Sequence, residues 1–326
     1  MPSQPQPFEL ERLVILGAGA VGASLAGLLH QSGFPVVLIA RGEHGRVLRE
    51  SGLCLRMPHQ TLRLKLTCYA HPEEVPWQPG DMAMLATKLQ DARGAMDDLQ
   101  AAAGKSMPLV CAVNGLHGEQ WAAERFETVL SMMVWVLATH LLPGEVRLHS
   151  SGPLGVLDTG PHQGAQAAAL SAALCTRLRA AGFDATSRAD ILLWKRAKWI
   201  SNIGGAAQAL VSDDWQSVVR AARVEAQGIL DAAGIERIPR ERFLERVQQI
   251  RSEEIEGLAR EGGSAWQSRE RGQPMETPWI EGALVALAEQ HGLRAPINAR
   301  LAQASQTPRA YKSEEILGLG GLGEVL

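Results

Sequence analysis

The sequence lacks the residue patterns that mark several large classes of protein. Its four cysteines, Cys54, Cys68, Cys111 and Cys175, form no CxxC pair and no metal-ligand spacing. We therefore expect neither a metal site nor a disulfide scaffold, and such scattered cysteines are typical of a reducing cytoplasm. The net charge of −3 gives no electrostatic reason to expect a nucleic-acid partner. Apolar and charged fractions of 46% and 21% are ordinary for a folded protein and exclude intrinsic disorder.

A membrane-spanning run and a secretory signal are also missing. The uncharged stretch 13–29 has 17 residues and contains four glycines, whereas a spanning helix needs about 20 apolar residues. The preceding segment carries Glu9 and Glu11 against Arg12, so it lacks the positive start of a signal peptide. We expect a cytoplasmic protein without a membrane span. Lysine is scarce as well, with six among 32 basic residues, so a lysine at a motif position stands out.

The apolar pattern divides the chain into an α/β half, about residues 1–188, and an all-helical half, about residues 189–326. A buried strand at 13–16, a helix at 22–31 and a buried strand at 36–40 predict a β-α-β unit. Further strands are expected at 53–57, 61–66, 82–86, 109–113, 128–137, 146–148 and 154–157, with helices at 89–103 and 163–181. No convincing strand follows Asp190. Helices are expected there at 190–211, 214–233, 239–260 and 277–290, with Asp213 or Asp214 capping the second.

The run Gly17-Ala18-Gly19-Ala20-Val21-Gly22 is a GxGxxG placed directly between a predicted strand and a predicted helix. In such a run the first glycine permits a tight turn, the second allows close approach of a pyrophosphate, and the third allows close helix–strand packing. The helix N-terminus adds free N–H groups and a positive dipole end. A glycine turn of any α/β protein is the alternative, but the flanking elements favour a Rossmann-type dinucleotide-binding domain.

The end of the second strand bears on the choice of cofactor. NAD-binding proteins usually have an acidic residue there, which bonds the ribose 2′-hydroxyl. This sequence has Arg41, with Arg46 nearby, and a guanidinium suits the 2′-phosphate of NADPH. Glu43 lies two residues further on and leaves the acidic alternative open. We favour NADPH.

The helical half begins with a pair of polar residues at helical spacing. Lys198 and Asn202 are four residues apart, so on a helix they share one face and could converge on a small ligand. Ser264 and Glu276 lie beside predicted helix starts, and Asn114 follows a buried strand, where open parallel sheets bind ligands. Each signal is weak when taken alone.

Together, these features resemble the ketopantoate reductase family of 2-dehydropantoate 2-reductases. The resemblance extends from Gly17 to about Leu301. It rests on GAGAVG at 17–22, Lys88 after Ala86-Thr87, Asn114-Gly115, Thr139-His140, the Lys198/Asn202 pair, Ser264 with Glu276 twelve residues later, Ile280-Glu281-Gly282 and residues 296–301.

The resemblance implies that NADPH reduces the C2 carbonyl of a 2-oxo acid, ketopantoate in particular, to a 2-hydroxy acid. It implies that Lys198 polarises the carbonyl and donates the proton, and that Glu276 hydrogen-bonds the reacting oxygen near the nicotinamide. Asn202 and Ser264 match substrate-binding positions, with Ser264 expected near the carboxylate. Further cofactor contacts are implied for Lys88, Asn114, which would also face the substrate, and the backbone of Ala138.

The sequence departs from the family pattern at two places. Ala206 stands where an asparagine is common, and 265–269 replaces a Met-Leu-Gln-Asp-type run. If Asn202 and Ala206 share one helix face, restoring asparagine at 206 should favour ketopantoate over 2-oxo acids that lack its distal hydroxyl. A reductase of another ketone or imine therefore remains open. A non-catalytic dinucleotide-binding protein would require Lys198 or Glu276 to be displaced. The helical half could also form a homodimer, through a face that the sequence does not identify.

Overall fold

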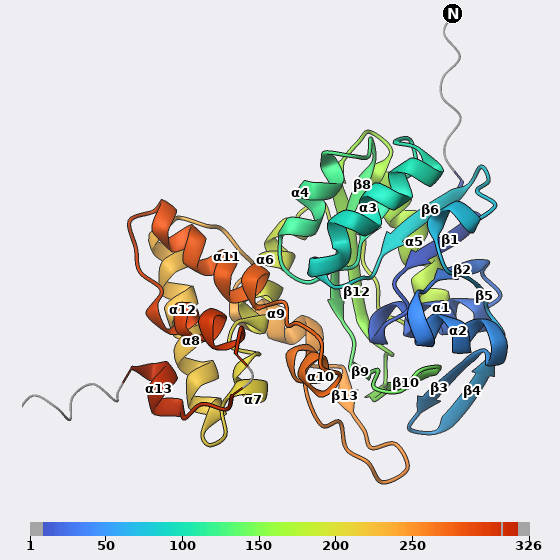
Figure 1. The fold of residues 1–326 in the computed structure, drawn as a ribbon. Coiled ribbons are helices and arrows are strands. Elements are labelled where there is room, and N and C mark those ends of the chain that lie inside the picture. The colour runs from blue at the N-terminus through green and yellow to red at the C-terminus, as the bar shows by residue number, and fades with distance from the viewer. Residues whose placement is uncertain (1–8, 308, 319–326) are drawn as a thin grey trace, which may run out of the picture. The chain divides into compact units, whose positions relative to one another are not determined.

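The computed structural model describes residues 9–307 and 309–318, and the chain divides into two units. One unit contains Met1–Leu192 and Glu241–Arg260, and the other contains Leu193–Arg240 and Glu261–Leu326. Figure 1 shows the sheets and their covering helices in the first unit and the helices of the second. The segment 241–260 thus folds with the α/β unit, although it lies within the part of the sequence expected to form the helical domain.

A seven-stranded sheet forms the centre of the first unit. Its strands, in order across the sheet, are β12 (Val156–Gln163), β8 (Val129–Trp135), β7 (Leu109–Cys111), β6 (Asp81–Leu85), β1 (Arg12–Leu16), β2 (Val36–Ile39) and β5 (Thr67–Tyr69). Neighbouring strands are parallel except β12, which runs antiparallel to β8. The chain first builds β2 and β5 on one side of β1 and then crosses to β6 and β7 on the other, so a topological switch point lies between β1 and β6. This confirms the Rossmann-type prediction.

Helices and a smaller sheet complete this unit. Its helices are α1 (Ala20–Gln31), α2 (Gly42–Ser51), α3 (Leu89–Ala103), α4 (His117–Ala123) and α5 (Ala167–Ala180), with a 3-10 turn η1 (Pro72–Glu74). The smaller sheet is β4 (Gln60–Leu64), β3 (Leu53–Met57), β10 (Glu145–Leu148) and β9 (Ala138–Thr139). β3 and β4 form the predicted antiparallel pair. Since α1 packs against β2, β9 and β10, the helix that follows the glycine turn contacts both sheets.

The second unit is built from helices. The helices beyond α5 are α6 (Ile191–Asn202), α7 (Ala207–Leu210), α8 (Trp215–Ala232), α9 (Arg240–Val247), α10 (Ser264–Glu270), α11 (Thr277–Gln290), α12 (Pro296–Ala304) and α13 (Ser313–Leu317). Of these, α9 belongs to the first unit from Glu241 onward, and the others form the second unit from Leu193 onward. Asp214 rather than Asp213 caps α8, because its Oδ1 accepts a hydrogen bond from the backbone N–H of Ser217 at 3.0 Å.

Two expected helices are shorter in the structure. The helix predicted over 190–211 ends at Asn202, because Gly204 takes φ +78° and starts a tight turn. A Cβ at Gly204 would stand 2.9 Å from the Cα of Val219, so α8 packs closely on this turn. The helix predicted over 239–260 ends at Val247, and β13 (Arg251–Ser252) then pairs with β11 (Ser150–Ser151). The expectation of no strand after Asp190 was therefore wrong.

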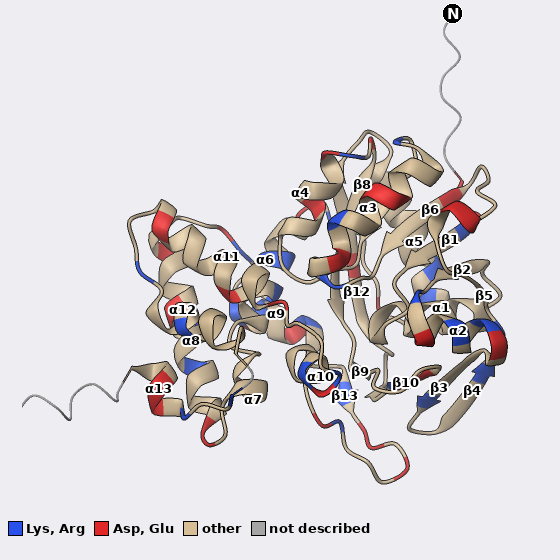
Figure 2. Ribbon diagram, viewed as in Figure 1, with Lys and Arg blue, Asp and Glu red and all other residues tan. Residues whose placement is uncertain are grey.

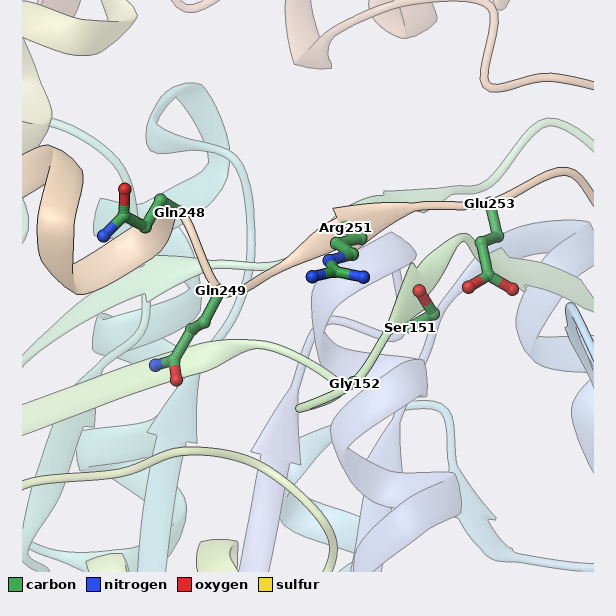
Figure 3. A pocket seen from close by; sticks show the side chains of 6 residues that line it. All are labelled: Ser151, Gly152, Gln248, Gln249, Arg251 and Glu253. Carbon is green, nitrogen blue, oxygen red and sulfur yellow. The ribbon is translucent and has the colours of Figure 1, made fainter.

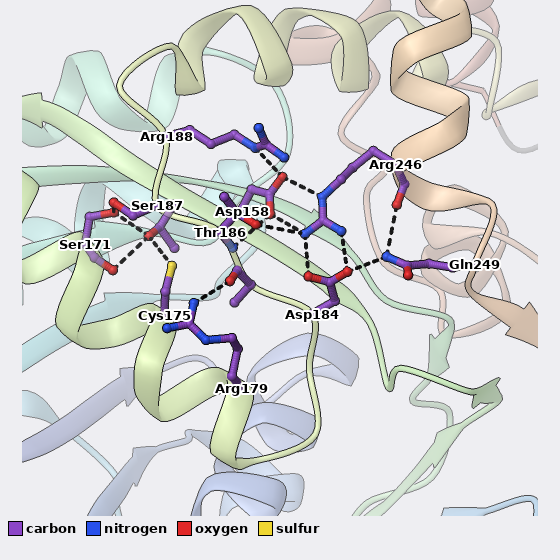
Figure 4. Close-up of polar contacts among 12 residues, drawn as sticks. Asp158, Ser171, Cys175, Arg179, Asp184, Thr186, Ser187, Arg188, Arg246 and Gln249 are labelled. Atoms are coloured by element: carbon purple, nitrogen blue, oxygen red, sulfur yellow. Dashed lines mark hydrogen bonds and ion pairs between the residues drawn. The ribbon is translucent and has the colours of Figure 1, made fainter.

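A buried ion pair explains why 241–260 folds with the first unit. Asp158 is fully buried and accepts hydrogen bonds from Arg188 Nε at 2.6 Å and Arg246 NH2 at 2.6 Å (Figure 4). Arg246 also donates to Asp184 Oδ1 at 2.8 Å. Burial acts to lower the pKa of Arg246, but its bonds to Asp158 and Asp184 outweigh burial and raise it. The paired guanidinium thus fixes α9 against the sheet.

The charged residues show no concentration of one sign. Figure 2 shows basic and acidic residues interspersed along the helices and strands of both units. Within the described residues, no helix is long and apolar enough to cross a membrane, and no group of three or more His, Cys, Asp and Glu side chains could hold a metal ion.

Candidate functional site

The glycine turn lies between β1 and α1 at the switch point of the main sheet. Gly17 has φ +101°, a conformation that favours glycine, and a Cβ there would stand 2.8 Å from the carbonyl carbon of Ala86. At Gly22, a Cβ would stand 1.9 Å from the carbonyl oxygen of Gly17, so this glycine allows close packing of α1 on the turn. At Gly19, by contrast, a Cβ would meet nothing within 4 Å. The protein therefore packs closely around Gly17 and Gly22, whereas the space beside Gly19 is open.

The open side of the turn suits an anion. α1 starts after Gly19 with no side-chain cap and no acidic residue in its first turn, so its positive end is not neutralised locally. Two hydroxyl oxygens, Thr87 Oγ1 and Thr139 Oγ1, are buried without a hydrogen-bond partner among the described residues. Thr87 directly precedes Lys88 and Thr139 directly follows Ala138, and both neighbours are candidate cofactor residues. These features fit a dinucleotide, whose phosphates and hydroxyls would supply the missing partners.

Arg41 lies just beyond the end of β2, and its interactions differ from those of the nearby Arg46. It is exposed, and none of the described residues accepts a hydrogen bond from its guanidinium. Arg46 instead pairs with Glu43 at 2.6 Å and with Glu50. Glu43 is thus engaged by a neighbour within α2, and the Arg46 pair lowers the pKa of its carboxyl group. Of these groups, the Arg41 guanidinium is the one without an ionic partner in the described part of the chain.

His44 is a contact of the glycine turn that the sequence did not suggest. Its Nδ1 accepts a hydrogen bond from the backbone N–H of Gly144 at 2.9 Å, so the other ring nitrogen carries the proton. Nε2 lies 2.8 Å from the carbonyl oxygen of Ala18 and donates to it. His44 therefore ties the turn to the loop before β10. No motif marks such a contact, because it joins residues 26 and 100 positions apart.

The other candidates of the first unit follow strand ends. Lys88 lies after β6 at the N-cap of α3, and Asn114 lies after β7 beside Gly115, which has φ +72°. Ala138 is buried on β9, opposite Leu148. Because β1, β6 and β7 are parallel neighbours, their carboxyl ends lie side by side. Lys88 and Asn114 therefore follow the same ends of the strands as the glycine turn does.

The second unit contains the remaining candidates, and α6 brings two of them together. Lys198 donates a hydrogen bond from Nζ to Oδ1 of Asn202 at 2.9 Å, one turn further along the helix. Both side chains are partly exposed. The spacing of four residues predicted this shared face.

Glu276 and Ser264 begin two other helices of this unit. Glu276 is 7% exposed and is the N-cap residue of α11. Ser264 is the exposed first residue of α10. The loop before it is held by Gln208 of α7, which accepts from Gly263 N–H at 2.9 Å and donates to the Glu261 carbonyl at 3.3 Å. Sequence reasoning did not identify Gln208.

Ala206 does not occupy the position expected for it. α6 ends at Asn202, and Ala206 lies beyond the turn as the N-cap residue of α7, 2% exposed. Residues 202 and 206 therefore do not share one helix face, and the expectation that they do was wrong. The cause is the positive φ of Gly204, which breaks the helix.

A surface pocket of about 610 Å³ lies elsewhere in the first unit. Figure 3 shows its lining at the β11–β13 pair, which consists of Ser151, Gly152, Gln248, Gln249, Arg251 and Glu253. None of the residues expected from the sequence lines it. We therefore do not assign this pocket to the candidate site.

The fold and the glycine turn are those of the Rossmann class of dinucleotide-binding domains. The helical unit contains the lysine–asparagine pair. Comparison with known proteins gives the family. Residues 13–161 match the family model for ketopantoate reductase PanE/ApbA, and residues 203–308 match the model for its C-terminal part. The chain belongs to the ketopantoate reductase family, a family of oxidoreductases.

Individual relatives are distant in sequence. A 2-dehydropantoate 2-reductase from Archaeoglobus fulgidus is 25% identical over 309 residues, which cover 90% of this chain and 96% of the relative. Among solved structures, a PanE/ApbA family ketopantoate reductase from Ralstonia eutropha has a TM-score of 0.74 at 24% identity, covering 90% and 97% of the two chains. D-mandelate dehydrogenase with NADH and anilino(oxo)acetate has a TM-score of 0.75 at 22% identity, with the same coverage. The two structures support the fold.

Proposed function

We propose that this chain uses NADPH to reduce the C2 carbonyl of a 2-oxo acid to a hydroxyl group, with 2-dehydropantoate as the first substrate to test. The observation that carries the proposal is the 2.9 Å bond between Lys198 and Asn202 in a chain of this family. An ammonium held by a neighbouring amide has a defined direction, which both carbonyl polarisation and proton donation require.

In this proposal, the bound cofactor supplies a hydride to the carbonyl carbon. Lys198 stabilises the negative charge that develops on the carbonyl oxygen and then gives that oxygen a proton from Nζ, which becomes a neutral amine. Asn202 accepts a hydrogen bond from the same nitrogen and limits its rotation. Glu276, buried at the start of α11, accepts a hydrogen bond from the hydroxyl group formed at the reacting oxygen, and Ser264 binds the substrate carboxylate through its hydroxyl group.

The cofactor is held by the first unit in this proposal. The open middle of the glycine turn and the uncapped start of α1 support a pyrophosphate position there. Arg41 would bind the 2′-phosphate, and its lack of an ionic partner among described residues supports NADPH over NADH. The residues proposed to contact the cofactor are Gly17, Ala18, Gly19, Ala20, Val21, Gly22, Arg41, Lys88, Asn114, Ala138 and Glu276.

A reductase of another ketone or imine is the second candidate, with other 2-oxo acids as the first compounds to test. It is favoured by residues 265–269, which follow Ser264 and replace a Met-Leu-Gln-Asp-type run that is common in the family.

The proposal is tested by mixing the protein with NADPH or NADH and a panel of 2-oxo acids, and following the loss of reduced-cofactor absorbance. The panel contains ketopantoate, trimethylpyruvate, which lacks its distal hydroxyl group, and the aryl compound benzoylformate. Turnover that is fastest with ketopantoate and NADPH supports the proposal. Turnover with the other acids alone supports the second candidate. Cofactor binding without any turnover contradicts both and indicates a non-catalytic dinucleotide-binding protein.

A further inference from the structure

The turn after α6 is held by two charged side chains from neighbouring helices. Glu281 of α11 is 1% exposed, and its Oε1 accepts a hydrogen bond from the backbone N–H of Gly204 at 3.1 Å. Arg223 of α8 donates from Nε to the Ile203 carbonyl at 3.1 Å and from NH2 to the Ser201 carbonyl. The carboxylate thus meets an N–H group, and the guanidinium meets carbonyls at the negative end of α6, the pairing that helix dipoles favour. Opposite charges fix the end of the helix that carries Lys198.

A second bond joins α6 to α11 beside the first. Trp199 donates from Nε1 to the carbonyl oxygen of Ile280 at 3.0 Å. Trp199 is adjacent to Lys198 in the chain, and Ile280 is adjacent to Glu281. One bond to α11 therefore lies next to Lys198, and the other lies two residues beyond Asn202. Glu276 begins the same helix α11. The bonds therefore connect the elements that carry Lys198 and Glu276.

We propose that Glu281 is a positioning residue whose buried carboxyl group fixes the turn after α6 and so keeps Lys198 and Asn202 in register with Glu276. The role of Glu281 in catalysis rests on the function proposed above. Its role in holding the turn does not. Glu281 is not one of the residues expected to contact substrate, because its carboxyl group bonds backbone N–H groups of its own unit.

The surroundings of Glu281 make its charge depend on pH near neutrality. Burial raises the pKa of Glu281 to about 7, backbone N–H bonds oppose this shift, and Glu276 on the same helix adds to it. The nearby cation on α8, Arg223, is bonded to backbone carbonyls. On α12, which packs against α11, the charged residue is Arg300, and it donates to the Ile316 carbonyl. On α6, Lys198 is bonded to Asn202.

The protonation state of the Glu281 carboxyl group determines how firmly it holds the turn. A carboxylate accepts a stronger hydrogen bond from Gly204 N–H than a neutral carboxyl group does. The raised pKa nevertheless means that the folded unit favours the neutral form, because ionisation adds the cost of keeping a charge away from water. We therefore expect the turn to open more easily above pH 7 than below it. Glu281→Gln has the same shape but stays neutral, so it reproduces the protonated state at every pH.

Hydrogen exchange tests the structural part of the inference. The matched control is Glu225→Gln, because Glu225 also accepts backbone N–H bonds in this unit, from Ile297 and Asn298 at 3.0 Å, but at the start of α12. At about pH 8, we expect Glu281→Gln to slow exchange in peptides spanning 199–210 roughly 10-fold relative to the wild type, because the neutral amide avoids the cost of burying a charge. Glu225→Gln should speed exchange at the start of α12 instead. Unchanged exchange at 199–210 in Glu281→Gln would overturn the inference, whether or not the protein has activity.

The pH dependence of turnover tests the catalytic part. At about pH 8, we expect kcat of the wild type to be roughly 10-fold below that of Glu281→Gln, with KM for NADPH unchanged, because the ionised carboxyl group loosens the turn and misplaces Lys198. At about pH 6, where the wild-type carboxyl group is protonated, the two kcat values should converge, and Glu225→Gln should follow the wild type at both. A ratio that does not change with pH would contradict a positioning role. If the wild type reduces no 2-oxo acid, the proposed function fails, and the exchange experiment still decides the role of Glu281 in the turn.

Discussion

Nζ of Lys198 lies 2.9 Å from Oδ1 of Asn202, one turn apart at the C-terminal end of α6. The helix ends at Asn202 itself, so the pair lies where α6 meets the turn that Glu281 and Arg223 hold. This arrangement gives the ammonium a fixed direction, which is the requirement for a proton donor.

Lys198→Ala should lower kcat by about 10²–10⁴-fold, the range for loss of general acid–base catalysis. KM for NADPH should change little, because all the residues proposed to bind it except Glu276 lie in the other unit. Steady-state kinetics with the preferred 2-oxo acid measures both constants, and Lys105→Ala, which removes an exposed lysine paired with Glu127, is the control. A raised substrate KM with unchanged kcat would make Lys198 a binding residue instead.

Arg41→Ala should raise KM for NADPH by about 10- to 100-fold, since a charged hydrogen bond to phosphate contributes about 1.5–3 kcal/mol. KM for NADH should be nearly unaffected, because NADH lacks the 2′-phosphate. Arg46→Ala is the matched control: its guanidinium is already paired with Glu43 and Glu50. Equal effects of Arg41→Ala on the two cofactors would rule out the 2′-phosphate role.

Ala206→Asn should destabilise the protein rather than improve its selectivity. Residue 206 is 2% exposed and separated from Asn202 by the Gly204 turn, so a buried amide there costs about 1–3 kcal/mol if it finds no partner. Thermal unfolding measures this loss. The ratio of kcat/KM for ketopantoate to that for trimethylpyruvate should stay the same, and a rise in this ratio would show that residue 206 does contact the substrate.

Arg246→Ala should lower the free energy of unfolding by about 3 kcal/mol, the lower end of the range for breaking a buried pair, since Arg188 still faces Asp158. Denaturant unfolding followed by fluorescence measures the change. Lys105→Ala breaks an exposed pair and should cost less than about 1 kcal/mol. A similar small loss in both variants would mean that the pair does not anchor α9.

Features encoded by local sequence could be predicted. The glycines at 17, 19 and 22 determine the turn between β1 and α1, and the alternation at 53–57 and 61–66 determines the β3–β4 hairpin. The four-residue spacing of Lys198 and Asn202 likewise places them on one helix face.

Features that depend on distant contacts could not be predicted. Arg246 bonds Asp158, 88 residues earlier, and this contact rather than local propensity assigns α9 to the first unit. Glu281 reaches Gly204 across 77 residues. The run Gly204-Gly205-Ala206 has the small residues of a close-packed helix, and only the contact with α8 shows that it forms a turn.

The most direct test of the proposed reaction follows the hydride itself. NADPH carrying deuterium at C4 of the nicotinamide is supplied in two forms, labelled on one face or on the other, together with the preferred 2-oxo acid. Mass spectrometry of the hydroxy acid should find one deuterium at C2 with one form and none with the other, because a fixed site transfers hydride from a single face. A hydroxy acid without deuterium from either form would contradict the proposed reduction.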